Sequence, residues 1–181
     1  MKIAILRIGP LDMEVLGKVQ GNLCSVFPET ACVILEDVMP IPEDAYNALR
    51  RQYHSSLLLA KIYDCAKESG VDRVLGITNV DLYVPRLNFV FGEAQCPGRV
   101  AIISLCRLKP EFYGQPANKE LFVERSKKEA VHEIGHTLGL GHCHDPACIM
   151  FFSNSILDTD RKSLAFCESC YPLVVKRLQR V

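Results

Sequence analysis

The chain of 181 residues has the length of one domain, and its 49% hydrophobic and 23% charged residues are typical of a folded globular protein, which excludes disordered and fibrous classes. Its 21 Lys and Arg balance its 21 Asp and Glu, so it lacks the excess positive charge that binds a nucleic-acid backbone. No apolar stretch approaches the ~20 residues of a membrane-spanning helix, and no secretory cleavage site follows the N-terminus. We expect a cytoplasmic protein that binds neither nucleic acid nor membrane.

The first half of the chain alternates between predicted strands and helices. Short apolar runs at 3–8, 31–35 and 73–77 predict three strands. A helix that begins after Asp12 and a long helix over 43–68 are expected between them. Strands connected through helices pair in parallel, so this half predicts an α/β scaffold.

The next segments complete the predicted sheet. Residues 88–95 and 99–105 are separated by Cys-Pro-Gly and predict two strands joined by a turn, one of them antiparallel at the sheet edge. A long helix is then expected from Asn118, a good N-cap, to Gly139.

The end of the chain differs in composition. Residues 142–181 contain clustered cysteines and a short predicted helix but little apolar periodicity, so this small lobe needs something besides a core to hold it. We expect one domain over residues 1–181, in which 1–141 carry the sheet and the long helices.

The long helix ends in the sequence HEIGHTLGLGH, from His132 to His142. His132 and His136 are one helical turn apart, so two imidazoles can bind one ion. Gly139 can end the helix and return the chain, which brings His142 to the same ion. Three histidines with an open fourth position predict a catalytic zinc site, whereas a helix with hydrogen-bonded histidines is the simpler alternative.

Glu133 lies between the two helical histidines. A zinc ion acidifies a bound water, and a carboxylate beside it can take the proton and deliver it to a leaving amine. The motif therefore predicts hydrolysis of peptide bonds with Glu133 as the catalytic residue.

Four cysteines follow the histidine motif with metal-binding spacing, as Cys143-x4-Cys148 and Cys167-x2-Cys170. Four thiolates form a closed structural zinc site. Two disulfides, or His144 in place of one cysteine, are the alternatives. The remaining cysteines lie among apolar residues and are expected to behave as small hydrophobes: Cys24, Cys32, Cys65, Cys96 and Cys106.

The histidine motif, the cysteine pattern and Met150 together resemble the archaemetzincin family of metzincin zinc metallopeptidases over residues 132–170. The resemblance implies an α/β fold with a mixed, twisted five-stranded sheet, long helices, an active-site cleft and a second zinc in the C-terminal lobe. It also implies that Met150 is the methionine of the Met-turn, packed beneath the histidines. Phe152 stands where some metzincins carry a tyrosine near the zinc, which argues against a tyrosine-assisted mechanism.

We therefore expect a monomer with two zinc ions, one catalytic and one structural, that hydrolyses peptides bound along residues 88–95 as an added strand. The alternatives are a catalytically weak zinc-binding interaction protein and a hydrolase of non-peptide amides. Glu133 argues against a purely structural site, because such a site needs no general base.

Overall fold

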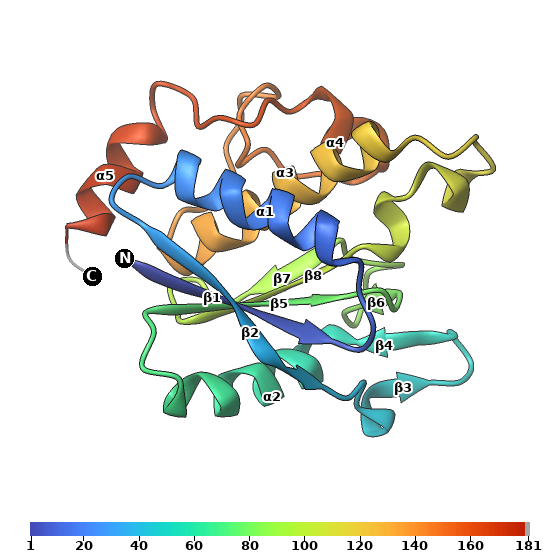
Figure 1. Cartoon of the computed structure of the whole chain (residues 1–181). Helices are drawn as coiled ribbons and strands as arrows, with labels where there is room; N and C mark the ends of the chain where they lie inside the picture. The colour runs from blue at the N-terminus through green and yellow to red at the C-terminus, as the bar shows by residue number, and fades with distance from the viewer. Residues whose placement is uncertain (180–181) are drawn as a thin grey trace.

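A computed structural model describes residues 1–179 and shows a sheet with helices on both faces (Figure 1). The strands are β1 (Lys2–Ile8), β2 (Ala31–Met39), β3 (Tyr46–Asn47), β4 (Gln52–His54), β5 (Arg73–Thr78), β6 (Leu82–Tyr83), β7 (Gly92–Ala94) and β8 (Val100–Ser104). The α-helices are α1 (Met13–Val26), α2 (Ser55–Glu68), α3 (Lys119–Thr137), α4 (Ile156–Arg161) and α5 (Tyr171–Leu178). Single 3-10 turns are η1 (Glu43–Ala45), η2 (Cys106–Leu108) and η3 (Pro110–Tyr113).

The main sheet has five strands in the order β2-β1-β5-β8-β7. The first four are parallel, and β7 runs antiparallel to β8 at the edge. Helices α1 and α3 cover one face and α2 covers the other (Figure 1). Strands enclosed on both faces must be apolar throughout, and every residue of β8 is buried. The predicted mixed five-stranded α/β fold with an antiparallel edge strand is confirmed.

The predicted helix over 43–68 is wrong in its first half. That stretch contains η1 and the hairpin of β3 and β4, and the helix begins only at Ser55. Arg51 takes a left-handed φ of 56° in the turn, and β4 pairs in parallel with the distant β6. This pairing outside the main sheet overrides the local helical pattern.

The edge strand is shorter than predicted. Of residues 88–95, only Gly92–Ala94 form β7, while Val90 makes an isolated bridge to Leu82. Arg86 has a left-handed φ of 75° shortly before this segment, so the chain turns there and approaches the sheet late.

The C-terminal lobe shares the main core, contrary to the expectation that it lacks one. Apolar residues of its irregular segments and short helices are buried in the layer that the sheet forms with α1 and α3. They have no periodic spacing, which is why the sequence pattern misses them. These residues include Ile149, Met150, Ile156 and Val174.

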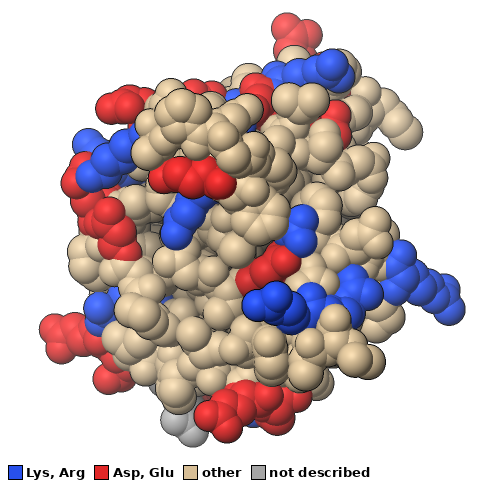
Figure 2. Space-filling model, turned by 90° about the vertical axis from the view of Figure 1, so that its right-hand side faces the viewer, with Lys and Arg blue, Asp and Glu red and all other residues tan. Residues whose placement is uncertain are grey.

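The surface is charge-balanced. On the face in Figure 2, acidic and basic side chains lie interspersed within a larger uncharged area. Among residues 1–179, none of the helices combines the length and the apolar sequence that a membrane span requires. Of the five cysteines expected to behave as small hydrophobes, three are exposed, namely Cys24, Cys65 and Cys96.

Candidate active site

Three imidazoles converge at the C-terminal end of α3. His132 and His136 project from successive turns, and their Nε2 atoms are 3.0 Å apart. The ring of His142 lies 5.4 Å from that of His132 and 4.8 Å from that of His136, between centroids. One ring nitrogen from each of the three lies within 4.8 Å of the others. Two nitrogens bound to one tetrahedral zinc are about 3.3 Å apart, so this arrangement fits the ion.

The backbone fixes which ring nitrogen is free to bind. His132 Nδ1 is 2.8 Å from the carbonyl oxygen of Ile149, and His136 Nδ1 is 2.7 Å from that of Leu140. Because a carbonyl only accepts, each Nδ1 must carry the proton, and each Nε2 keeps its lone pair. Such partners orient metal-binding histidines.

Gly139 ends α3 and turns the chain toward the third histidine. Its φ is +84°, its N–H donates to the His136 carbonyl at 2.7 Å, and Leu140 N–H donates to the Gly135 carbonyl at 3.2 Å. This pair of bonds is a Schellman motif. A Cβ at position 139 would lie 2.9 Å from Arg177 Nη1, the movable end of a long side chain, so the left-handed dihedral is what favours glycine.

Met150 is fully buried beneath the histidine pair. A Cβ at Gly135 would lie 2.5 Å from its sulfur, so the glycine inside the motif makes room for the methionine. The Met150 carbonyl accepts the Cys143 N–H at 2.9 Å, which couples this turn to the residue after His142. This placement supports the Met-turn interpretation. Phe152 packs on His142 at 4.8 Å between ring centroids and offers no hydroxyl.

Glu133 lies against the edge strand. A Cβ at Gly92 would be 2.6 Å from the Glu133 carboxylate and 2.7 Å from the Ile102 carbonyl oxygen, so an alanine there would collide with both. Sequence reasoning missed Gly92, because only the packing of α3 on β7 brings the two residues together.

Burial controls the protonation of these groups. It lowers the pKa of His132 and of His136, and to a lesser extent the charge of Lys162 lowers both as well. Burial also lowers the pKa of His142. Neutral imidazoles are the form that binds a metal. Burial raises the pKa of Glu133 well above its ordinary value, and the nearby Glu129 carboxylate raises it further.

A cleft of about 510 Å³ opens in front of these groups. Glu133 and the three histidines line it, together with the segment from Leu87 to Ala94 and residues Phe152 to Asn154. The cleft thus gives an extended ligand access to the histidines.

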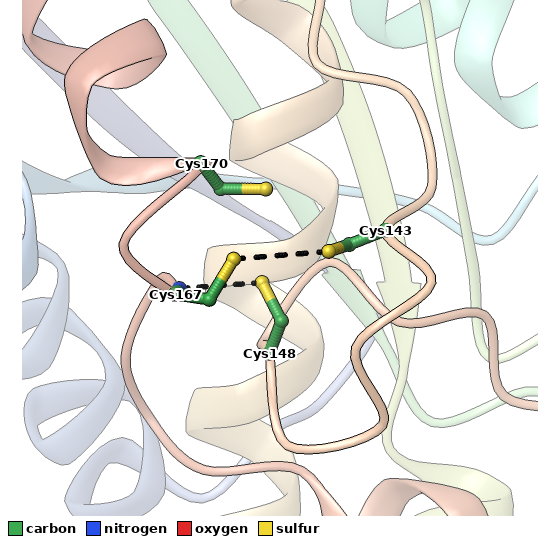
Figure 3. A group of neighbouring side chains, drawn as sticks. All are labelled: Cys143, Cys148, Cys167 and Cys170. Atoms are coloured by element: carbon green, nitrogen blue, oxygen red, sulfur yellow. Dashed lines mark hydrogen bonds between the residues drawn. The ribbon is translucent and has the colours of Figure 1, made fainter.

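Next to this site, the four cysteines form a second cluster, and Figure 3 shows their side chains pointing toward one another. Their sulfurs lie within 4.8 Å of one another, and Cys143 Sγ is 3.8 Å from Cys167 Sγ. A zinc tetrahedron with bonds of 2.3 Å has edges of about 3.8 Å, whereas a disulfide needs about 2.05 Å. His144 is exposed and lies outside this cluster.

The thiols differ in acidity. Burial raises the pKa of Cys148 and of Cys170. At Cys167, burial acts to raise the pKa, but hydrogen bonds from the backbone of Cys170 and Ser169 lower it to about 7. Cys167 is therefore the thiol that ionises most readily, while Cys148 and Cys170 could bind a metal only after losing their protons.

Three converging imidazoles beside a carboxylate, in an open cleft, are the groups of a zinc-dependent hydrolase. Comparisons with known proteins agree. A model of peptidase family M54 matches residues 8–177. An archaemetzincin of Methanocaldococcus jannaschii is 45% identical over 179 residues, which are 99% of this chain and 93% of the relative.

Solved structures show the same likeness. The archaemetzincin of Methanopyrus kandleri has a TM-score of 0.85 and 38% identity, and the match covers 99% of this chain and 96% of that one. The archaemetzincin of Archaeoglobus fulgidus, complexed with malonate, has a TM-score of 0.81 and 38% identity, with 96% and 99% covered. The chain belongs to peptidase family M54, the family of the archaemetzincins, and is a zinc metallopeptidase.

Proposed function

We propose that His132, His136 and His142 bind the catalytic zinc of this peptidase and that Glu133 is its general base. The observation that carries the proposal is the approach of two Nε2 atoms to 3.0 Å while both Nδ1 atoms face carbonyl oxygens. The chain acts as one catalytic domain, in which the segment from residue 142 is the zinc-stabilised lobe.

The chain's own groups carry the proton. Zinc in this site would supply a Lewis acid that lowers the pKa of a bound water toward about 7. Glu133 removes the proton from the attacking water and delivers it to the amine nitrogen that leaves. Burial raises the pKa of this carboxyl, which makes its ionised form a stronger base toward the attacking water.

The edge strand provides the place for a peptide. Phe91 accepts from Ser104 N–H at 2.8 Å, and Gln95 N–H donates to Val100 at 3.0 Å, so both groups bond toward β8. Backbone groups alternate in an antiparallel pair, so those of Gly92 and Ala94 face away from β8. Within the described residues no strand pairs with Gly92–Ala94 on that side, and the bridge from Val90 to Leu82 ends just before it. An extended peptide can add there and cross the histidines.

A second zinc on Cys143, Cys148, Cys167 and Cys170 has a structural role in this proposal. Cys143 directly follows His142, and Cys148 lies two residues before Met150. A closed four-thiolate site there stabilises the third ligand and the Met-turn together. The protein is proposed to act as a monomer.

Peptide-library cleavage by the zinc-loaded protein tests the proposal, with new termini identified by mass spectrometry. We expect cleavage that a chelator abolishes and added zinc restores. His136→Ala should be inactive, and His144→Ala is the matched control that should remain active. If no peptide in a broad library is cleaved, a zinc-binding interaction protein or a hydrolase of non-peptide amides replaces this proposal.

A further inference from the structure

A buried ion pair lies beside the cleft and takes no part in the proton transfer described above. Glu129 is one helical turn before Glu133 on α3 and is 2% exposed. Its Oε1 accepts from Lys162 Nζ at 3.0 Å and from Thr159 Oγ1 at 3.1 Å. Lys162, also 2% exposed, is the C-cap of α4, so the pair joins α3 to α4.

One oxygen of this carboxylate remains available. Both bonds fall on Oε1, and Oε2 has no hydrogen-bond partner among the residues that the structure describes. Oε2 is also not one of the fully buried side-chain atoms that lack a hydrogen-bond partner. Since Glu129 lines the cleft, this acceptor faces the space that a substrate occupies.

The rest of the cleft limits what can reach this oxygen. Leu87, Phe89, Phe91 and Phe152 provide apolar and aromatic lining. The charged residues in the described lining are acidic, so an anionic side chain is repelled. A cationic side chain would meet the Lys162 ammonium, which lies 3.0 Å from the same carboxylate. An apolar side chain that ends in an uncharged hydrogen-bond donor avoids both repulsions.

We propose that Glu129 is a specificity-determining residue, whose free oxygen accepts a hydrogen bond from an uncharged donor at the end of an apolar substrate side chain, as in tyrosine. The inference rests on the proposed peptide cleavage at the neighbouring histidines. A hydrogen bond to a charged acceptor corresponds to a preference of about 10- to 100-fold over the same side chain without the donor.

Tyrosine and phenylalanine form the matched probe, because they differ by one hydroxyl. Dipeptide hydroxamates that differ only in this residue should be titrated into the zinc-loaded protein by calorimetry. The tyrosine compound should bind about 10- to 100-fold more tightly. Equal dissociation constants, or no binding of either compound, would overturn the proposal.

Two variants locate the effect at Glu129. In Glu129→Gln the one amide oxygen stays with Lys162 and the NH₂ faces the cleft, where the phenol oxygen can only accept a neutral hydrogen bond, so the tyrosine preference should fall by about 5- to 10-fold. The variant Glu129→Met/Lys162→Met removes both charges at similar volume and should abolish the preference. It provides a second test in case Glu129→Gln does not fold. Retention of the full preference in either folded variant would overturn the proposal.

A neighbouring ion pair supplies the control. Arg125 Nε is 2.7 Å from Asp160 Oδ1 and also joins α3 to α4, but neither residue lines the cleft. Asp160→Asn should therefore alter stability without altering the tyrosine preference. Because binding needs no turnover, a tyrosine preference without peptide cleavage would contradict the proposed function alone. Cleavage without the preference would contradict the subsite alone.

Discussion

His142 and Cys143 are consecutive residues, yet they belong to two clusters with opposite surroundings. Two of the three histidines lie on the regular helix α3, and the group faces a cleft. The four cysteines lie on irregular segments and at the start of a short helix, with Cys148 and Cys170 buried. A cluster that is open to a cleft is typical of a catalytic metal site, and a closed cluster is typical of a structural one. Two adjacent residues can therefore belong to sites of different kinds.

The acidity of the ligands separates the clusters further. Burial lowers the pKa of His132 and His136, so these rings are neutral and ready to bind at pH 7. Burial raises the pKa of Cys148 and Cys170, so these thiols hold their protons until a metal displaces them. Burial thus keeps the histidine cluster in its metal-binding form, whereas it opposes ionisation of the two cysteine thiols.

The largest expected effect is that of Glu133→Ala. Loss of the proposed general base should lower kcat/KM by about 10²- to 10⁴-fold, while the fold and the zinc content should persist because the proposal does not use Glu133 as a ligand. Steady-state kinetics and elemental analysis measure both quantities. Glu120→Ala, on the exposed first turn of the same helix, is the control. Full activity in Glu133→Ala would reject the proposed mechanism.

Cys148→Ser should act on stability. Loss of a buried ligand opens the closed site, and we expect the Tm to fall by about 10 °C or more, with one zinc ion lost. Calorimetry gives the shift. Cys65→Ser replaces an exposed cysteine on α2 and should leave both quantities unchanged. An unaltered Tm in Cys148→Ser would show that the cluster is not structural.

Gly92→Ala tests how the edge strand positions the general base. The added Cβ meets the Glu133 carboxylate at 2.6 Å, and a displacement near 1 Å can cost about 10²-fold in rate. We expect a lower kcat with zinc retained. Gly17→Ala in α1 adds a Cβ in open space and should leave kcat unchanged. An unchanged kcat in Gly92→Ala would contradict this positioning role.

The smallest effect is the pH dependence of stability without zinc. Because the pKa values of His132 and His136 are lowered in the folded chain, these histidines bind protons below about pH 6.5 in the unfolded chain but not in the folded chain. Stability is therefore present above that pH and is lost as pH falls, by at most about 1.4 kcal/mol per pH unit for each ring. Thermal melting at pH 7.5 and 5.5 measures the slope, and His136→Gln should reduce it.

Glu133 contributes with the opposite sign. Its raised pKa means that the folded state keeps a proton that the unfolded state loses above about pH 4.5, so its contribution is lost as pH rises. Glu133→Gln should consequently steepen the loss of stability between pH 7.5 and 5.5. An unchanged or flatter slope would contradict the buried, protonated carboxyl of the metal-free chain.

The sequence predicted those features that depend on short spacing. The three histidines and Glu133 occupy eleven residues, and a glycine at position 139 allows the turn, so the convergence of the histidines could be predicted from local geometry. The parallel strands followed from apolar runs. Gly92 and the pair of Glu129 with Lys162 could not be found this way, because packing between distant elements creates these contacts.

The incorrect prediction of a helix over 43–54 also results from contacts between distant parts of the chain. Tyr46 pairs with Tyr53 across the hairpin, and Tyr53 pairs with Leu82 almost thirty residues later, so no local signal decides the structure. The aromatic residues and Asn47 at the turn were the available hints. The buried residues of the C-terminal lobe were missed because irregular segments have no period to recognise.

The count of zinc ions in purified protein and in two variants tests most directly whether the histidines and the cysteines form two separate zinc sites. Elemental analysis should give two zinc ions per chain for the wild type and one for each of His136→Ala and Cys148→Ser. Activity should disappear in the histidine variant, and the large fall in Tm should appear in the cysteine variant. One zinc ion in the wild type, or two in either variant, would contradict the presence of two separate sites.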